Sequence, residues 1–84
     1  MYKLIFEKKA ENFFRKLERF EQERITKKFN ELEKNPELGK PLTANLSGLW
    51  SLRFGDYRAI YQIKHEELII LILKLGHRKN VYDN

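Results

Sequence analysis

The chain has 84 residues, no cysteine and a formal net charge of +5. This length predicts one domain over residues 1–84 with a modest core, and the lack of cysteine excludes disulfides and thiolate metal sites and is typical of a reducing compartment. A hydrophobic fraction of 42%, with 13% aromatic residues, is that of a globular rather than a disordered chain.

The N-terminus shows no signal peptide, because it becomes charged at Lys3, and the longest apolar run, residues 68–73, is too short to cross a bilayer. We therefore expect a cytoplasmic protein with no membrane contact. The two histidines, His65 and His77, lack the spacing used in zinc sites, so we expect no metal and no cofactor. The positive charge by itself indicates an anionic partner, which could be nucleic acid, an anionic membrane or an acidic protein.

The first half of the chain predicts a strand and two helices. Residues 2–6 alternate in the manner of a short strand. Apolar residues then recur with helical spacing in two stretches, the second running from about Glu21 to Lys34 and ending before Pro36. These residues are Ala10, Phe13, Phe14 and Leu17 in the first helix and Ile25, Phe29 and Leu32 in the second. The short connection predicts an antiparallel αα-hairpin.

The second half is rich in predicted strands. Residues 35–48 contain two prolines and two glycines and predict a loop. Residues 49–54 and 57–64 flank Gly55-Asp56, a two-residue hairpin turn with glycine first, and residues 68–75 predict a central strand that is apolar on both faces. The expected fold is α+β, in the order βααβββ, with an antiparallel sheet and the αα-hairpin packed on one face.

The two-residue turn fixes the register of this hairpin. It pairs Phe54 with Tyr57 and Arg53 with Arg58, and it places an apolar and aromatic set on the face that carries the helices. This set is Trp50, Leu52, Phe54, Tyr57, Ala59, Tyr61 and Ile63. The two arginines then emerge together on the opposite face, where Leu49 and Ile60 are expected as exposed apolar neighbours.

Like charges that face each other across neighbouring strands cost roughly 0.2–1 kcal/mol. The pair Arg53 and Arg58 therefore indicates that an anion binds between them, and the guanidinium fork suits phosphate. The alternative is that both arginines are solvated or pair with distant acids such as Asp83.

Residues 48–61, Gly-Leu-Trp-Ser-Leu-Arg-Phe-Gly-Asp-Tyr-Arg-Ala-Ile-Tyr, followed by residues 76–82, Gly-His-Arg-Lys-Asn-Val-Tyr, resemble the RelE/ParE superfamily of toxins from type II toxin–antitoxin systems. With the helical hairpin, these blocks cover nearly the whole chain. The resemblance to RelE implies an endoribonuclease, an mRNA interferase that cleaves mRNA in the ribosomal decoding site and inhibits translation. It also implies neutralisation by a cognate RelB-like antitoxin.

The resemblance carries site residues with it. It implies that Arg53, Arg58, Arg78 and Tyr82 form the catalytic site, in which the ribose 2′-hydroxyl attacks the adjacent phosphate without a metal. Arginines suit the stabilisation of the developing negative charge, but their pKa is too high for a general base, so Tyr82 and His77 are the local candidates for proton transfer. Lys40, Lys74 and Lys79 are expected to bind substrate.

The chain departs from its relatives at one place. Well-known ribosome-dependent members carry lysines where this chain has Leu49 and Ser51, so a base or charge stabiliser must come from elsewhere. This departure leaves two alternatives open: a ParE-like toxin that inhibits DNA gyrase, and a noncatalytic RNA-binding or interaction domain of the same fold. For the antitoxin, we expect an acidic, amphipathic segment that covers the arginine face or the helical hairpin.

Overall fold

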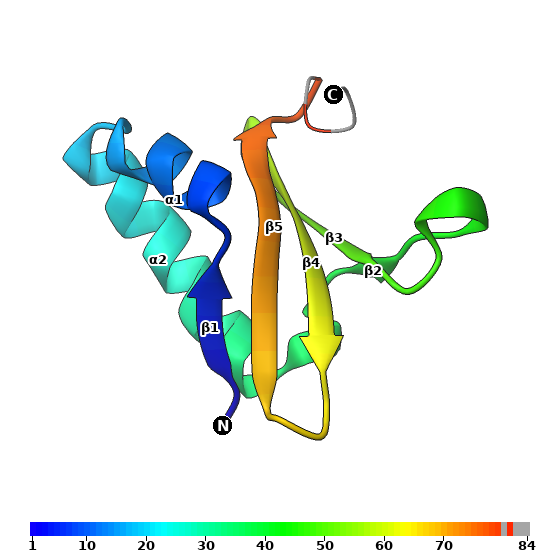
Figure 1. The fold of residues 1–84 in the computed structure, drawn as a ribbon. Coiled ribbons are helices and arrows are strands. Elements are labelled where there is room, and N and C mark those ends of the chain that lie inside the picture. The colour runs from blue at the N-terminus through cyan, green and yellow to red at the C-terminus, as the bar shows by residue number, and fades with distance from the viewer. Residues whose placement is uncertain (80, 82–84) are drawn as a thin grey trace.

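The computed structural model describes residues 1–79 and 81 (Figure 1). In chain order the elements are β1 Lys3–Phe6, α1 Lys8–Arg15, α2 Arg19–Lys34, the 3₁₀ turn η1 Pro36–Leu38, β2 Lys40–Pro41, the 3₁₀ turn η2 Ala44–Leu46, β3 Trp50–Phe54, β4 Tyr57–Lys64 and β5 Ile69–His77. The expected α+β architecture, with an N-terminal helical pair followed by a strand-rich half, is confirmed.

The sheet has five strands in the order β1-β5-β4-β3-β2. The pairs β2–β3, β3–β4 and β4–β5 are antiparallel as expected, but β1 runs parallel to β5, with Lys3 opposite Ile69 and Phe6 opposite Ile72. The sheet is therefore mixed rather than purely antiparallel. Because β1 and β5 pair across the whole length of the chain, no local turn signal in the sequence could set their relative direction.

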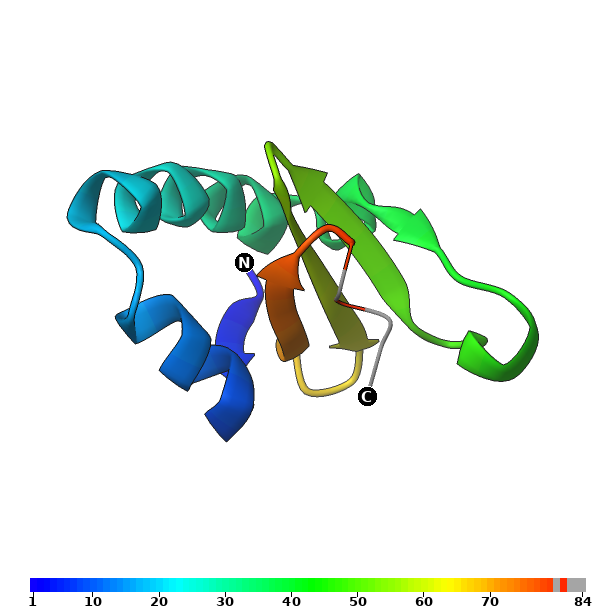
Figure 2. The same cartoon turned by 90° about the horizontal axis from the view of Figure 1, so that it is seen from above.

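Both helices lie on one side of the sheet, as the view from above shows (Figure 2). We call this side the helix-covered face. Its core joins the stripe of α2 to the inward residues of the strands, all at most 7% exposed: Ala10, Ile25, Phe29, Leu32, Leu52, Ala59, Tyr61, Ile70, Ile72 and Leu75. The expected inward set of the hairpin is confirmed, since Trp50, Phe54, Tyr57 and Ile63 pack against this core.

The α1–α2 connection is short, and a side chain of α2 caps the C-terminal end of α1. α1 ends at Arg15 and α2 begins at Arg19, a little before the predicted Glu21. The amide Nε2 of Gln22 donates hydrogen bonds to the carbonyl oxygens of Phe14 at 2.8 Å and Arg15 at 3.4 Å. Phe14 O already accepts from the backbone N–H of Leu17 at 3.1 Å, so Gln22 adds a second hydrogen bond there and also bonds Arg15 O, in the last turn, where helix carbonyls lack helical partners.

The predicted loop over residues 35–48 is more ordered than expected, because it contains β2 and two 3₁₀ turns. Its first part is fixed to the sheet by Tyr61, whose hydroxyl donates to Pro36 O at 2.7 Å and accepts from Gly39 N at 3.1 Å. Position 39 admits no side chain, since a Cβ there would lie 2.4 Å from Ser51 O. A buried tyrosine and a glycine thus set the position of β2.

The β3–β4 hairpin has the predicted register, with Trp50 opposite Tyr61, Arg53 opposite Arg58 and Phe54 opposite Tyr57. Gly55 has φ +61°, the conformation that the first position of this turn requires. Between β4 and β5 the register shifts at Ile60/Tyr61, so that Ile60 pairs with Lys74 but Tyr61 pairs with Ile72. This β-bulge turns both Ile72 and Leu75 into the core.

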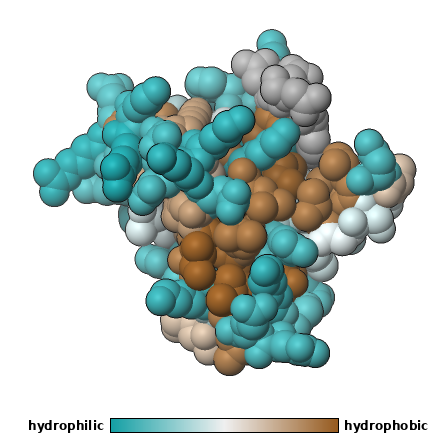
Figure 3. All heavy atoms as spheres, in the orientation of Figure 1, coloured by the Kyte–Doolittle hydropathy of each residue, from teal (hydrophilic) through white to brown (hydrophobic). Residues whose placement is uncertain are grey.

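The other side of the sheet, which we call the helix-free face, is partly covered. Ile60, expected to be exposed, is only 3% exposed and Leu49 is half-buried, which corrects the expectation. Val81, which follows β5, covers part of this face, because it is buried and its Cγ2 lies 3.6 Å from the place of a Cβ on Gly76. On β1 and β5, Ile5, Ile69 and Leu71 remain partly exposed. Figure 3 shows an apolar area on the side of the molecule that faces the viewer.

Candidate active site

The arginine pair occupies the helix-free face close to the tip of the hairpin. Arg53 is exposed, whereas Arg58 is half-buried and donates from Nη1 to Ser51 Oγ at 2.7 Å. Ser51 is only 4% exposed and stands on β3 two residues before Arg53. The hydroxyl of Ser51 therefore holds one branch of the Arg58 guanidinium against the sheet, and the fork is partly oriented before any ligand binds.

A cleft of about 330 Å³ opens beside the arginine pair, at the edge of the sheet that β2 covers only in part. Its lining contains four cationic side chains and no acidic one. The lining residues are Lys28, Leu38, Gly39, Lys40, Ser51, Leu52, Arg53 and Arg58. A concave surface whose charged side chains are all cationic raises the local concentration of anions. The arginines also have planar guanidinium groups, whose N–H donors match the oxygens of a phosphate.

Lys40 enters this cleft from β2, where it pairs with Ser51. Its position depends on the contacts of Tyr61 with residues 36–39, which fasten the chain immediately before Lys40. Burial raises the pKa of the Tyr61 hydroxyl above its ordinary value of 10.0, although the hydrogen bond from Gly39 acts in the opposite direction. A neutral phenol, able both to donate and to accept, is thus favoured at this junction.

Arg78 lies next to the hairpin turn. Its backbone N–H donates to Asp56 O at 2.8 Å, and its side chain is half-buried. Gly76, two residues earlier, pairs with Arg58 across the sheet. The third arginine therefore follows the strand that borders the arginine pair, as the sequence predicts. Lys79 comes next and is exposed, while Tyr82 lies outside the described residues.

Lys74 and His77 lie on β5, on different faces of the sheet. Lys74 pairs with Ile60 and belongs to the helix-free face. His77 pairs with Tyr57 and stacks on it, with ring centroids 5.2 Å apart, and Phe13 of α1 lies 5.8 Å from the histidine ring. This places the His77 ring in an aromatic cluster on the helix-covered face, so the structure does not bring it together with Arg53 and Arg58.

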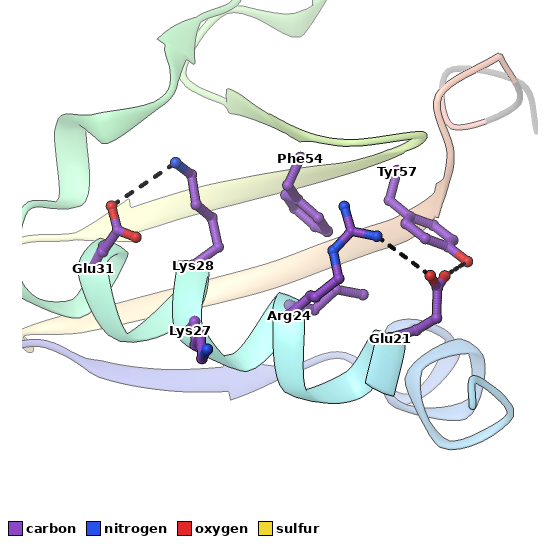
Figure 4. A pocket seen from close by; sticks show the side chains of 8 residues that line it. Glu21, Arg24, Lys27, Lys28, Glu31, Phe54 and Tyr57 are labelled. Carbon is purple, nitrogen blue, oxygen red and sulfur yellow. Dashed lines mark hydrogen bonds and ion pairs between the residues drawn. The ribbon is translucent and has the colours of Figure 1, made fainter. Parts of the chain in front are cut away.

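A second hollow, of about 220 Å³, lies on the helix-covered side between α2 and the tip of the hairpin (Figure 4). Two contacts to Glu21 connect α2 with the hairpin here. The Tyr57 hydroxyl donates a hydrogen bond to the Glu21 carboxylate, and Nη1 of Arg24, also on α2, lies 3.6 Å from Glu21 Oε1. The hydrogen bond to Glu21 and burial raise the pKa of Tyr57. Three basic and two acidic side chains line this hollow, so its cationic excess is smaller than that of the first, which has four basic side chains and no acidic one.

The sequence interpretation missed Lys28 and the role of Ser51. Lys28 belongs to α2, far in sequence from the strand motif, and only the packing of α2 beside β3 brings it to the cleft. Among residues 1–79 and 81, histidine and acidic side chains form no group of three or more that could hold a metal. None of the described helices has the length and hydrophobicity needed to span a bilayer.

Residues 4–82 match the family described as the ParE toxin of the type II toxin–antitoxin system parDE. This chain belongs to that family. Two curated proteins are similar to this chain over 55 residues: toxin RelG of Mycobacterium tuberculosis at 40% identity and toxin RelE of the same species at 42%. The match covers 64% of this chain but only 63% of RelG and 57% of RelE, less than two thirds of either relative.

Solved structures extend the family likeness over the whole fold. A chain of the toxin–antitoxin complex RelBE2 from Mycobacterium tuberculosis has a TM-score of 0.83 at 33% identity, over 92% of this chain and 98% of that one. A chain of the archaeal RelE–RelB complex from Pyrococcus horikoshii has a TM-score of 0.74 at 28% identity, over 95% and 98% of the two chains. The isolated RelE toxin of E. coli has a TM-score of 0.78 at 25% identity, over 92% and 84%.

Proposed function

We propose that this protein is the toxin of a type II toxin–antitoxin pair and acts as a metal-independent endoribonuclease on mRNA in the ribosomal decoding site. The observation that carries the proposal is the cleft in which Arg53, Arg58 and Lys40 meet with no acidic residue in the lining. A neutralised or purely structural pair of arginines would not need a concave surrounding whose charged side chains are all cationic. Membership of the toxin family and the likeness to RelE chains support the same conclusion.

The reaction proposed is attack of a ribose 2′-oxygen on the adjacent phosphorus. The new 2′-O–P bond forms as the P–5′-O bond breaks, which leaves a cyclic phosphate on one fragment and, after protonation, a 5′-hydroxyl on the other. Extra negative charge develops on the phosphate oxygens in the transition state, where fixed guanidinium donors have most effect. Arg58, oriented by Ser51, and Arg78, beside the hairpin turn, are the proposed charge stabilisers.

Proton transfer needs other groups, since an arginine does not act as a base near neutral pH. Tyr82 remains proposed for this role, together with His77. His77 would have to act from the aromatic cluster at the end of β5 or after a rearrangement, because its ring lies on the face opposite the arginine pair. Lys74 and Lys79 are proposed as phosphate contacts outside the cleft.

The proposed partner is a RelB-like antitoxin. The structures of RelBE2 and of the archaeal RelE–RelB pair are toxin–antitoxin complexes, and this chain shares their toxin fold. The apolar strip of Ile5, Ile69 and Leu71 on the helix-free face would suit the apolar side of an amphipathic segment, and the net charge of +5 would suit an acidic one. Because the proposed target is the translating ribosome, we place the protein in the cytoplasm.

The test is mRNA cleavage mapped on programmed ribosomes, for wild type and for Arg78→Ala, with ribosome-free message as a parallel sample. We expect cuts inside the codon of the decoding site, only when ribosomes are present, and about 100-fold slower cleavage in the variant, the effect typical of losing one donor to a developing oxyanion. An intact message with folded wild-type protein would refute the nuclease.

The second candidate function is inhibition of DNA gyrase. It is favoured by the match to the ParE toxin family. Under that alternative, the purified protein would block supercoiling of relaxed plasmid by gyrase and would leave ribosome-bound message intact. The same two assays therefore separate the candidates. A protein that neither cleaves mRNA nor inhibits gyrase, and whose RNA affinity depends only on its charge, would be the noncatalytic domain.

A further inference from the structure

Lys28 projects into the cleft from α2, and its place on the helix explains how. It lies three residues after Ile25 and four before Leu32, which are both buried, so it stands on the same row of the helix at the margin of the core face. Its side chain is 35% exposed. In such a position a lysine stem packs along apolar neighbours while the ammonium group reaches water.

Lys27, the preceding residue, leaves the helix in another direction, as Figure 4 shows. It is exposed and lines the hollow on the helix-covered side but not the cationic cleft, whereas Lys28 lines both. The two residues thus have the same charge and the same helix but different surroundings. They form a matched pair in which only the second faces the arginines of the sheet.

The contact of Lys28 with acid is weak. Its Nζ lies 3.8 Å from Oε1 of Glu31, whose side chain is 60% exposed. Exposed pairs at this spacing contribute little, and Glu31 does not line the cleft. Among residues 1–79 and 81, the ion-pair partner of Lys28 is the exposed Glu31. A phosphate in the cleft could therefore bind the Lys28 ammonium group without displacing a buried acid.

We propose that Lys28 is a phosphate-binding residue of the RNA cleft and supplies, from α2, the lysine charge that the strand positions Leu49 and Ser51 do not supply. The proposal rests on the proposed nuclease function. A backbone phosphate between α2 and β3 would be bound by Lys28 on one side and by Lys40 and Arg53 on the other. The substrate would then cross the edge of the sheet beyond the end of β2, where β3 continues from Leu52 to Phe54 without pairing to it.

The experiment compares Lys28→Ala with Lys27→Ala in single-turnover cleavage on programmed ribosomes, at several salt concentrations and over a range of toxin concentration. We expect Lys28→Ala to lower cleavage at limiting toxin about tenfold and to reduce the slope of log affinity against log salt by about 0.7, the value for one phosphate contact to single-stranded RNA. Lys27→Ala should stay close to wild type in both. Lys28→Arg, which keeps the charge, should recover most of the activity.

Glu31→Gln separates phosphate binding from a merely structural ion pair. If the pair with Glu31 only fastened α2, Lys28→Ala and Glu31→Gln would lower activity together and would lower the urea midpoint together. Phosphate binding predicts opposite effects: Glu31→Gln should cut at least as well as wild type, because it removes the charge that competes with phosphate. If wild type cuts the message and Lys28→Ala and Lys27→Ala are equally active, this inference alone is overturned. If wild type leaves the message uncut, the proposed function is overturned, and this inference falls with it.

Discussion

On the helix-covered face of the sheet, Leu52, Ala59 and Tyr61 are at most 4% exposed and belong to the same core as the apolar stripe of α2. On the helix-free face, in the same two strands, Arg53 is exposed and Arg58 is held by a buried serine. One hairpin therefore contributes its stability through one set of alternate residues and its candidate chemistry through the other. Substitutions at adjacent positions of this hairpin should therefore separate stability from activity.

Leu32→Ala tests the helix-covered face and should have the largest effect on stability. Leu32 is completely buried, and truncating a buried leucine leaves a cavity that costs about 2–5 kcal/mol of unfolding free energy. Urea denaturation followed by circular dichroism measures this loss. Cleavage per folded molecule should remain near that of wild type at a temperature where the variant is folded, and a specific loss of cleavage there would show that the two faces are coupled.

Arg58→Ala tests the helix-free face. We expect about 100-fold slower cleavage, equivalent to about 2.7 kcal/mol of transition-state stabilisation. The urea midpoint should fall less than in Leu32→Ala, because the lost hydrogen bond to Ser51 is partly offset by relief of the repulsion from Arg53. Single-turnover cleavage on programmed ribosomes measures the first quantity. The control is Lys64→Ala, an exposed cation at the far end of the same strand, which should cleave normally.

Tyr61→Phe tests the junction between the two faces, because the ring lies in the core and the hydroxyl positions the chain before Lys40. Removing the hydroxyl leaves Gly39 N–H and Pro36 O without this partner, which should cost about 1–3 kcal/mol of stability. Cleavage should fall as well, in contrast to Leu32→Ala. Urea denaturation and single-turnover cleavage of the same preparation provide the two values.

The pH dependence of stability provides a further check on Tyr61. Its pKa is raised in the folded chain, so the folded state holds the phenol proton more tightly than the unfolded state, whose pKa is near 10.0. Its contribution is therefore complete below that pH and is lost as the pH rises through the higher folded value. Tyr57 acts in the same direction. Wild type should lose stability at alkaline pH, and Tyr61→Phe should lose less.

Arg53→Gln should have the smallest effect, and it should change stability and cleavage in opposite directions. Arg53 stands opposite Arg58, and relieving this repulsion should raise the free energy of unfolding by about 0.2–1 kcal/mol. Cleavage should decrease, since one donor of the cleft is lost. A variant that is both less stable and fully active would contradict the idea that the arginine pair is kept for an anion.

Some features of this protein are determined locally along the chain. The sequence determined the hairpin, since Gly55 at φ +61° sets a two-residue turn and strand alternation then places Arg53 beside Arg58. It also determined the end of α2, because Pro36 excludes the helical conformation from the residue before it. These features depend on residues a few positions apart, whose conformations and spacing are constrained by the chain itself.

Only the tertiary structure decided the rest of the site. The parallel pairing of β1 with β5 and the bulge opposite Ile60 both depend on contacts between distant segments. Contacts between distant segments likewise decide that His77 faces the helices, that Ile60 is buried, and that Lys28 reaches the cleft from α2. The sequence alone specifies the alternation within each element, but packing decides which faces meet, because the free energy of burying a face depends on what lies across from it.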